Sequence, residues 1–83
     1  ISEKPIDNGN TFTDTAGNNS ISSAAGTTLT DAAGNTYITT AAGSELTNAN
    51  GDITKLTAAG TEVTDALGNN ASYGANGISI ADA

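Results

Sequence analysis

The chain has 83 residues, of which only 13 are Leu, Ile, Val or Phe, and its formal net charge at pH 7 is −7. Nine acidic residues against two basic ones exclude the positive surface on which binding to nucleic acid or anionic lipid depends. So few large apolar residues would place an irregular chain of this charge in the disordered class. The absence of Cys and His removes disulfides and a structural zinc site as sources of stability.

Residues 1–10 are predicted to form an irregular leading segment. Pro5, the only Pro of the chain, removes a backbone donor and restricts Lys4 to extended conformations. No stretch of the 83 residues approaches the roughly 20 apolar residues of a membrane helix, so the chain is not expected to insert into a membrane directly. The chain contains no Met, and we expect it to be part of a longer protein.

The remainder, residues 11–83, is a tandem repeat with a 17-residue period. Shifting Leu29–Gly43 by one period in either direction finds a similar stretch, and the glycines fall in two columns with the same spacing. An unbroken period over four copies is the signature of an array of one supersecondary unit. The copies are Phe12–Gly26, Leu29–Gly43, Leu46–Gly60 and Val63–Gly77, and a fifth begins at Ile80.

Each repeat divides into two half-units, in which Thr, Ser and one large apolar residue precede a turn that ends in Gly. Because Thr is β-branched and Gly interrupts any helical apolar spacing, the half-units predict short strands in an all-β array. The apolar positions are Phe12, Leu29, Leu46, Val63 and Ile80 in the first half-units, and Ile21, Ile38, Leu56 and Tyr73 in the second.

Stacked units of this kind are expected to bury a narrow, continuous apolar core. In the third and fourth repeats Lys55 and Ser72 stand at the phase of Ile21 and Ile38. We expect the adjacent residues, Leu56 and Tyr73, to take over the inward-facing role. One copy of the chain would still have a thin core, and domains this small often need a further source of stability. Oligomerisation is the source that remains.

Aspartates recur at one phase of the repeat and are predicted to form turns. Asp31 precedes Gly34 by three residues, so its side-chain oxygen can accept bonds in an Asx-turn while Gly takes a positive φ. Asn48 can play the same part, and the column therefore needs no metal ion to explain it. The spacing of a glycine-rich calcium repeat and the loop of an EF-hand are both absent. The column consists of Asp14, Asp31, Asn48, Asp65 and Asp82.

Two stretches, Thr61–Ile80 (TEVTDALGNNASYGANGISI) and Thr27–Gly43 (TTLTDAAGNTYITTAAG), resemble the repeats in the passenger regions of trimeric autotransporter adhesins. In these Gram-negative surface fibres, apolar-Thr-Asp-x-x-Gly-Asn units alternate with Tyr/Thr-Gly/Ala-x-x-Gly-apolar units. The resemblance covers residues 11–83. The chain has neither the coiled-coil heptads nor the membrane-anchor region of a complete adhesin.

The resemblance implies an elongated, intertwined homotrimeric β-prism at the bacterial cell surface, as the passenger of a protein anchored in the outer membrane. The implied function is cell adhesion, with a role in virulence. The segment would project and space binding regions that attach to host extracellular matrix, to a cell-surface ligand or to other surfaces.

A single-chain β-solenoid with one coil per repeat is the alternative fold. It would serve as a structural spacer, a filament subunit or an ice-binding module. Its aspartates would stack at about 4.8 Å, an unfavourable arrangement of like charges. Glu45 and Glu62 also interrupt the threonine array that ice binding would use. That array contains Thr13, Thr30, Thr47 and Thr64.

The sequence nominates no catalytic, cofactor-binding or metal-binding residue, and its ligand-binding residues stay unknown. Without His or Cys, nucleophilic catalysis is unsupported, and the carboxylates are too evenly spread for an acid and base pair. Tyr37 and Tyr73 are expected to pack on strands or to lie at a rim. We therefore expect no enzymatic activity and no cofactor.

Overall fold

The computed structural model describes residues 9–83, and every regular element within them is a β-strand. Only Gly9 and Asn10 of the predicted leading segment lie within the described residues, and Asn10 already begins the first strand. The strands are β1 (Asn10–Thr13), β2 (Asn19–Ser23), β3 (Gly26–Thr30), β4 (Thr36–Thr40), β5 (Gly43–Thr47), β6 (Ile53–Thr57), β7 (Gly60–Thr64), β8 (Asn70–Gly74) and β9 (Gly77–Ala81).

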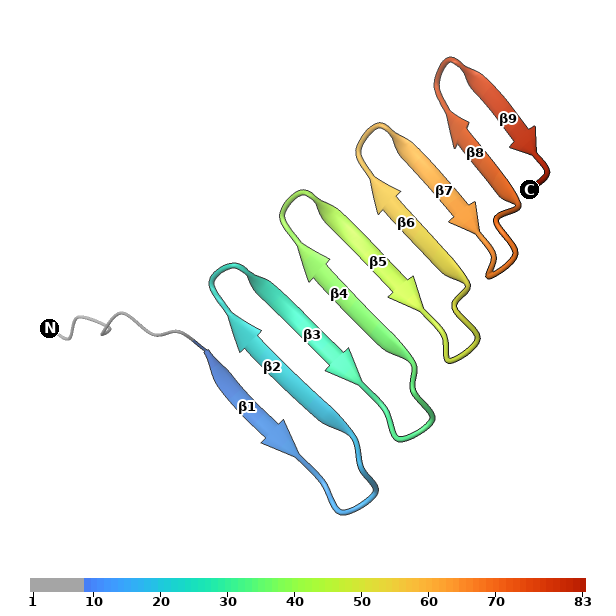
Figure 1. Ribbon diagram of the computed structural model, residues 1–83. Coiled ribbons are helices and arrows are strands. Elements are labelled where there is room, and N and C mark those ends of the chain that lie inside the picture. Colours follow the sequence, from blue (N-terminus) through green and yellow to red (C-terminus); the bar gives the residue numbers. More distant parts are fainter. Residues whose placement is uncertain (1–8) are drawn as a thin grey trace, which may run out of the picture.

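The nine strands form one open antiparallel sheet in which each strand pairs with its neighbours in sequence. Figure 1 shows the result as a ladder of hairpins in a single layer, and the smallest dimension of the molecule is only 13 Å. Each repeat supplies two strands of the ladder. The predicted all-β, elongated repeat array is thus confirmed. The hairpins differ from the solenoid alternative, in which each repeat would form one coil.

The pairing register divides the side chains between two faces, because directly opposed residues of antiparallel strands point to the same side. We call the side that carries Phe12 the uncharged face and the other side the charged face. Two rows of residues cross the uncharged face. The apolar row is Phe12, Ser20, Leu29, Tyr37, Leu46, Thr54, Val63, Ala71 and Ile80, and the second row is Asn10, Ser22, Thr27, Thr39, Ser44, Leu56, Thr61, Tyr73 and Ile78.

No side chain among residues 9–83 is buried. The sequence predicted a narrow core, and a single copy of the described chain does not form one. The physical reason is the number of layers, since a hydrophobic core requires two packed layers of secondary structure. Most of the large apolar residues of the strands lie on the uncharged face, as a core would require, but nothing within the described chain covers them.

The apolar residues of the second half-units do not share one face, contrary to the prediction. Ile21 and Ile38 lie on the charged face, in register with Thr28. Leu56 and Tyr73 lie on the uncharged face, in register with Thr61. A displacement of one residue along a strand moves a side chain to the opposite face. Leu56 and Tyr73 therefore add to the apolar surface that Phe12 and Leu29 begin, and Ile21 and Ile38 do not.

Three of the four hairpin turns along one edge of the sheet are closed by two alanines and a glycine. In the turn between β4 and β5, the Thr40 hydroxyl donates to the Gly43 carbonyl (3.2 Å) and accepts from the N–H of Ala42 (3.2 Å). Gly43 has φ +154°, and a Cβ at this position would overlap the carbonyl oxygen of Leu56 on the neighbouring strand. Glycine is required here by the close approach of two backbones.

Substitution of Gly43 by alanine is expected to destabilise the sheet more than the same substitution at Gly77. Both residues have positive φ, but nothing lies within 4 Å of a Cβ built on Gly77. Gly77→Ala therefore carries only the backbone strain, and Gly43→Ala adds the collision with Leu56. We expect the difference in unfolding free energy to be about 1–3 kcal/mol. Urea unfolding followed by circular dichroism at one protein concentration measures it, and equal losses would contradict the close-approach explanation.

Candidate interaction surface

The most distinctive surface of the molecule is the apolar row, which runs across all nine strands of the uncharged face. Seven of its nine residues are apolar. The large ones remain exposed, from Tyr37 at 36% to Ile80 at 78%. A continuous exposed apolar surface on a soluble chain marks a contact site with another molecule. The row is therefore the candidate functional surface.

The apolar surface widens toward the C-terminal half of the sheet. The second row contains Leu56, Tyr73 and Ile78 there, whereas Ser22, Thr27, Thr39 and Ser44 occupy it in the N-terminal half. Near the other end, small Ser20 leaves a shallow hollow between Phe12 and Leu29. The uncharged face is thus uneven, and its C-terminal half carries more apolar surface than its N-terminal half.

All charged side chains of the strands lie on the charged face. Glu45, Lys55 and Glu62 follow one another across β5, β6 and β7 in direct register, an alternation of sign that favours cross-strand pairing. Asn70 donates to Glu62 Oε2 (3.1 Å) and to Thr64 Oγ1 (2.9 Å). The same face carries the threonine row of Thr30, Thr47 and Thr64, and Glu45 and Glu62 lie in the adjacent row.

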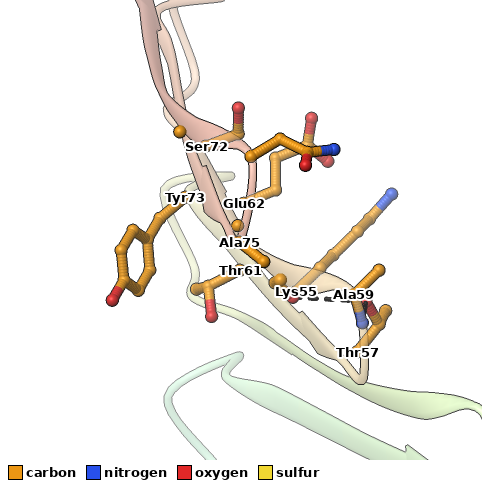
Figure 2. A pocket seen from close by; sticks show the side chains of 12 residues that line it. Lys55, Thr57, Ala59, Thr61, Glu62, Ser72, Tyr73 and Ala75 are labelled. Atoms are coloured by element: carbon orange, nitrogen blue, oxygen red, sulfur yellow. Dashed lines mark hydrogen bonds between the residues drawn. The ribbon is translucent and has the colours of Figure 1, made fainter.

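A second hollow lies near the tips of the last hairpins, where Gly60, Gly74 and Gly77 provide no side chains. Figure 2 shows Tyr73 and Thr61 on one side of the sheet and Lys55 on the other. The functional groups around the hollow therefore do not converge on one point. We assign no chemistry to it.

The Asx-turns predicted from the aspartate column are confirmed at Asp14, Asp31, Asn48 and Asp65. Asp31 Oδ1 accepts from the N–H groups of Ala33 (3.0 Å) and Asn35 (2.9 Å), and Oδ2 accepts from the side-chain amide of Asn35 (2.9 Å). Gly34 donates its N–H to the Asp31 carbonyl (3.3 Å). The turns that begin at Asp14 and Asp65 repeat this arrangement.

The third turn makes the same bonds with the two residue types exchanged. Asn48 accepts from the N–H groups of Asn50 and Asp52 (3.0 Å each), and its side-chain amide donates to Asp52 Oδ2 (2.9 Å). The amide and the carboxylate have changed places, but the donor and acceptor pair remains. This exchange supports the structural role of the column. Among residues 9–83, no three acidic, His or Cys side chains gather as a metal site would require.

Consecutive turns are also bonded to one another along this edge of the sheet. Asn35 Oδ1 accepts from the N–H of Ala49 (3.3 Å), and Asp52 Oδ1 accepts from the N–H of Ala66 (3.2 Å). Asn69 Oδ1 accepts from the N–H of Ala83 (2.9 Å). The fifth residue of each of these turns thus holds the next turn in place.

Hydrogen bonding lowers the pKa of the turn aspartates. The side-chain amide of Asn35 contributes most for Asp31, followed by the N–H of Asn35, and together they hold the pKa below the ordinary value of 3.8. Asn18 and Asn69 act in the same way on the pKa values of Asp14 and Asp65. The carboxylate form is favoured because it accepts more bonds than the acid.

Both tyrosines lie on the uncharged face, Tyr37 in the apolar row on β4 and Tyr73 in the second row on β8. They are four strands apart and do not form a common site. The sequence did not identify the uncharged face as a unit, because that requires the register of all nine strands. The described residues include no helix long and apolar enough to cross a membrane. Comparisons with protein-family models, curated proteins and solved structures find no match for this chain.

The turn aspartates predict a loss of stability in acid. A group whose pKa is lowered by folding stabilises the fold above its unfolded pKa, here about 3.8, and loses that effect as the pH falls through the folded pKa. Melting temperatures should therefore drop as the pH falls from roughly 5 to 2. The combined variant Asp14→Asn, Asp31→Asn, Asp65→Asn should show a smaller drop, and an unchanged pH profile would contradict the assignment.

Proposed function

We propose that this chain is a structural and adhesive segment of a bacterial cell-surface fibre of the trimeric autotransporter adhesin kind. In this proposal three copies pack their uncharged faces around a common axis as a three-sided β-prism, in which each copy keeps its own nine-stranded sheet. The observation that carries it is the apolar row, which is exposed along the whole sheet of a chain whose described residues form no core. The 17-residue period and the resemblance of the repeats to passenger regions support the same reading.

The segment would work by geometry and number rather than by chemistry. An elongated sheet sets a distance between the regions before and after it, and three parallel copies display any binding region three times. Linked binding sites raise the overall avidity without new contacts. The host matrix or cell-surface ligand would be contacted by those regions or by the charged face.

The oligomeric state is the direct test. Size-exclusion chromatography with light scattering should give three times the 8.1 kDa chain mass, with the circular dichroism of β-strands and cooperative melting. A fusion to a trimeric coiled coil ahead of residue 1 keeps a weak trimer assembled. A folded monomer without the fusion, whose melting temperature the fusion does not raise, would rule out the trimer and return the function to a single-chain spacer.

The proposed association also predicts that two exposed leucines contribute unequally to stability. Leu46 lies in the apolar row and is 49% exposed in one chain, whereas Leu67 lies on a turn outside both rows and is 78% exposed. Leu46→Ala should lower stability by about 2 kcal/mol or more per chain because the side chain is buried on assembly. Leu67→Ala should change it by less than about 0.5 kcal/mol.

The readout is the melting temperature at several protein concentrations, since linkage to association makes it rise with concentration. Equal effects of the two substitutions, or a melting temperature that does not depend on concentration, would contradict burial of the apolar row between copies.

A further inference from the structure

Copies of a repeat protein that associate through a repeating surface can also associate when one copy is displaced by a whole repeat. The strands with odd numbers present Phe12, Leu29, Leu46, Val63 and Ile80 to the apolar row, one from each copy of the repeat. One repeat advances by two strands, roughly 9.6 Å along the sheet. Two copies displaced by this distance would match the same apolar residues of the odd strands again.

The even-numbered strands break this degeneracy. Their residues in the apolar row are Ser20 on β2, Tyr37 on β4, Thr54 on β6 and Ala71 on β8. These four side chains differ in volume and in hydrogen-bonding capacity, so a displacement by one repeat sets Tyr37 level with Ser20 or Thr54. Polar residues inside an apolar contact are known to specify register in coiled coils. Without a displacement, every copy contributes the same residue to each level.

Charge and area indicate that the partner on this face is a second copy of the chain. Each copy has a formal net charge of −7, and the strand residues of the uncharged face include no carboxylate or amine. Turn aspartates border this face, since Asp14 and Asp31 line the hollow beside Phe12, and Asp65 and Asp82 line another beside Ile80. Copies that meet through the strand residues of this face therefore leave their carboxylates at its margin. Nine strands about 4.8 Å apart present on the order of 500–600 Å² of planar surface. That area approaches the roughly 800 Å² per partner of a stable interface.

Closure of the assembly adds a further constraint. A symmetric ring of copies requires the same surface relation at every contact, and displacements that add up around the ring leave it open. A closed trimer therefore needs copies at equal height. The even-strand residues supply the difference in side-chain packing that can select this arrangement.

We propose that copies of this chain pack in register through the uncharged face, and that Ser20, Tyr37, Thr54 and Ala71 set the register. The inference rests on the self-association proposed above. It adds that equivalent strands of the copies lie at the same height, and it names the residues that determine this register. The odd strands then provide most of the apolar contact, and the even strands provide its alignment.

The absence of Cys allows single cysteines to report the register. Thr27 and Ser44 occupy the same phase of consecutive repeats, and both lie in the second row of the uncharged face. Chains carrying Thr27→Cys and chains carrying Ser44→Cys are labelled with different masses, unfolded together, refolded and cross-linked with a short bis-maleimide. Mass spectrometry then identifies which positions have been joined. Products that join like positions are expected, and mixed products between positions 27 and 44 are expected to be absent.

Thr28→Cys and Glu45→Cys provide the matched control, because they are the next residues along the same strands and lie on the charged face. Cross-linking between copies at these positions should be much slower. A second background carries Ser20→Thr, Tyr37→Thr and Ala71→Thr, so that the even-strand residues of the apolar row are all Thr. It should still associate, but displaced arrangements should now form as well and give mixed products. Tyr37→Thr alone should give them partially, and circular dichroism confirms that the strands are retained.

The outcomes separate the two proposals. A chain without the fusion that stays monomeric by light scattering at every concentration, and whose strands melt no higher within the coiled-coil fusion, overturns the proposed function and this inference together. An oligomer that cross-links through the charged face overturns only the assignment of the face. Mixed products in the unaltered background would indicate a staggered assembly, with Tyr37 over the hollow at Ser20, and would overturn the register. Continued absence of mixed products in the second background would overturn the role of the even strands.

Discussion

A β-sheet one layer thick satisfies its backbone but cannot bury its side chains. Each inner strand of this sheet pairs on both edges, so the hydrogen-bonding groups of the backbone are used within the chain. Net stabilisation by such bonds is modest, because water would have satisfied the same groups. Burial of apolar surface is the dominant favourable term in folding, and here it depends on a second surface that covers the uncharged face. The rest of the design follows from this need.

The two sides of the sheet are divided accordingly. Leu29, Leu46 and Val63 lie along one side, and Glu45, Lys55 and Glu62 lie on the other. In the proposed assembly the charged side would face water and oppose association through the wrong face. Alternation along each strand makes this division possible with very few large residues. A composition that resembles a disordered chain is therefore compatible with an ordered array.

Local features of the structure were predictable from the sequence, and features that depend on counting along the strands were not. The role of Asp31 followed from its distance to Gly34, because an Asx-turn is closed by bonds between near neighbours in the chain. The separation of Ile38 and Leu56 onto opposite faces was missed. Lys55 shares the phase of Ile38, so Leu56 shares the phase of Thr39, and alternation already places it on the opposite side from Ile38. The missing core could not be predicted, because a narrow apolar stripe suits one uncovered layer as well as several packed layers.

The turns that begin with Asp or Asn differ from those closed by Ala-Ala-Gly in how they connect to their neighbours. Bonds such as that from Ala49 to Asn35 tie consecutive Asx-turns together. At the other edge Gly43 allows the backbones to approach closely, and the Thr40 hydroxyl bonds only within its own turn. One edge is thus held by side-chain bonds between repeats, and the other is held by close packing of the main chain.

The direction of the strands also has a mechanical meaning. The array extends perpendicular to its strands (Figure 1), so tension along it pulls adjacent strands apart and loads their hydrogen bonds one hairpin at a time. A folded repeat advances by roughly 9.6 Å, whereas the same repeat as extended chain spans about 56–61 Å. Each repeat that opens under load therefore releases several times its folded length. In the proposed fibre, such a segment would hold a fixed length at low force and would lengthen steeply once the first hairpin has opened.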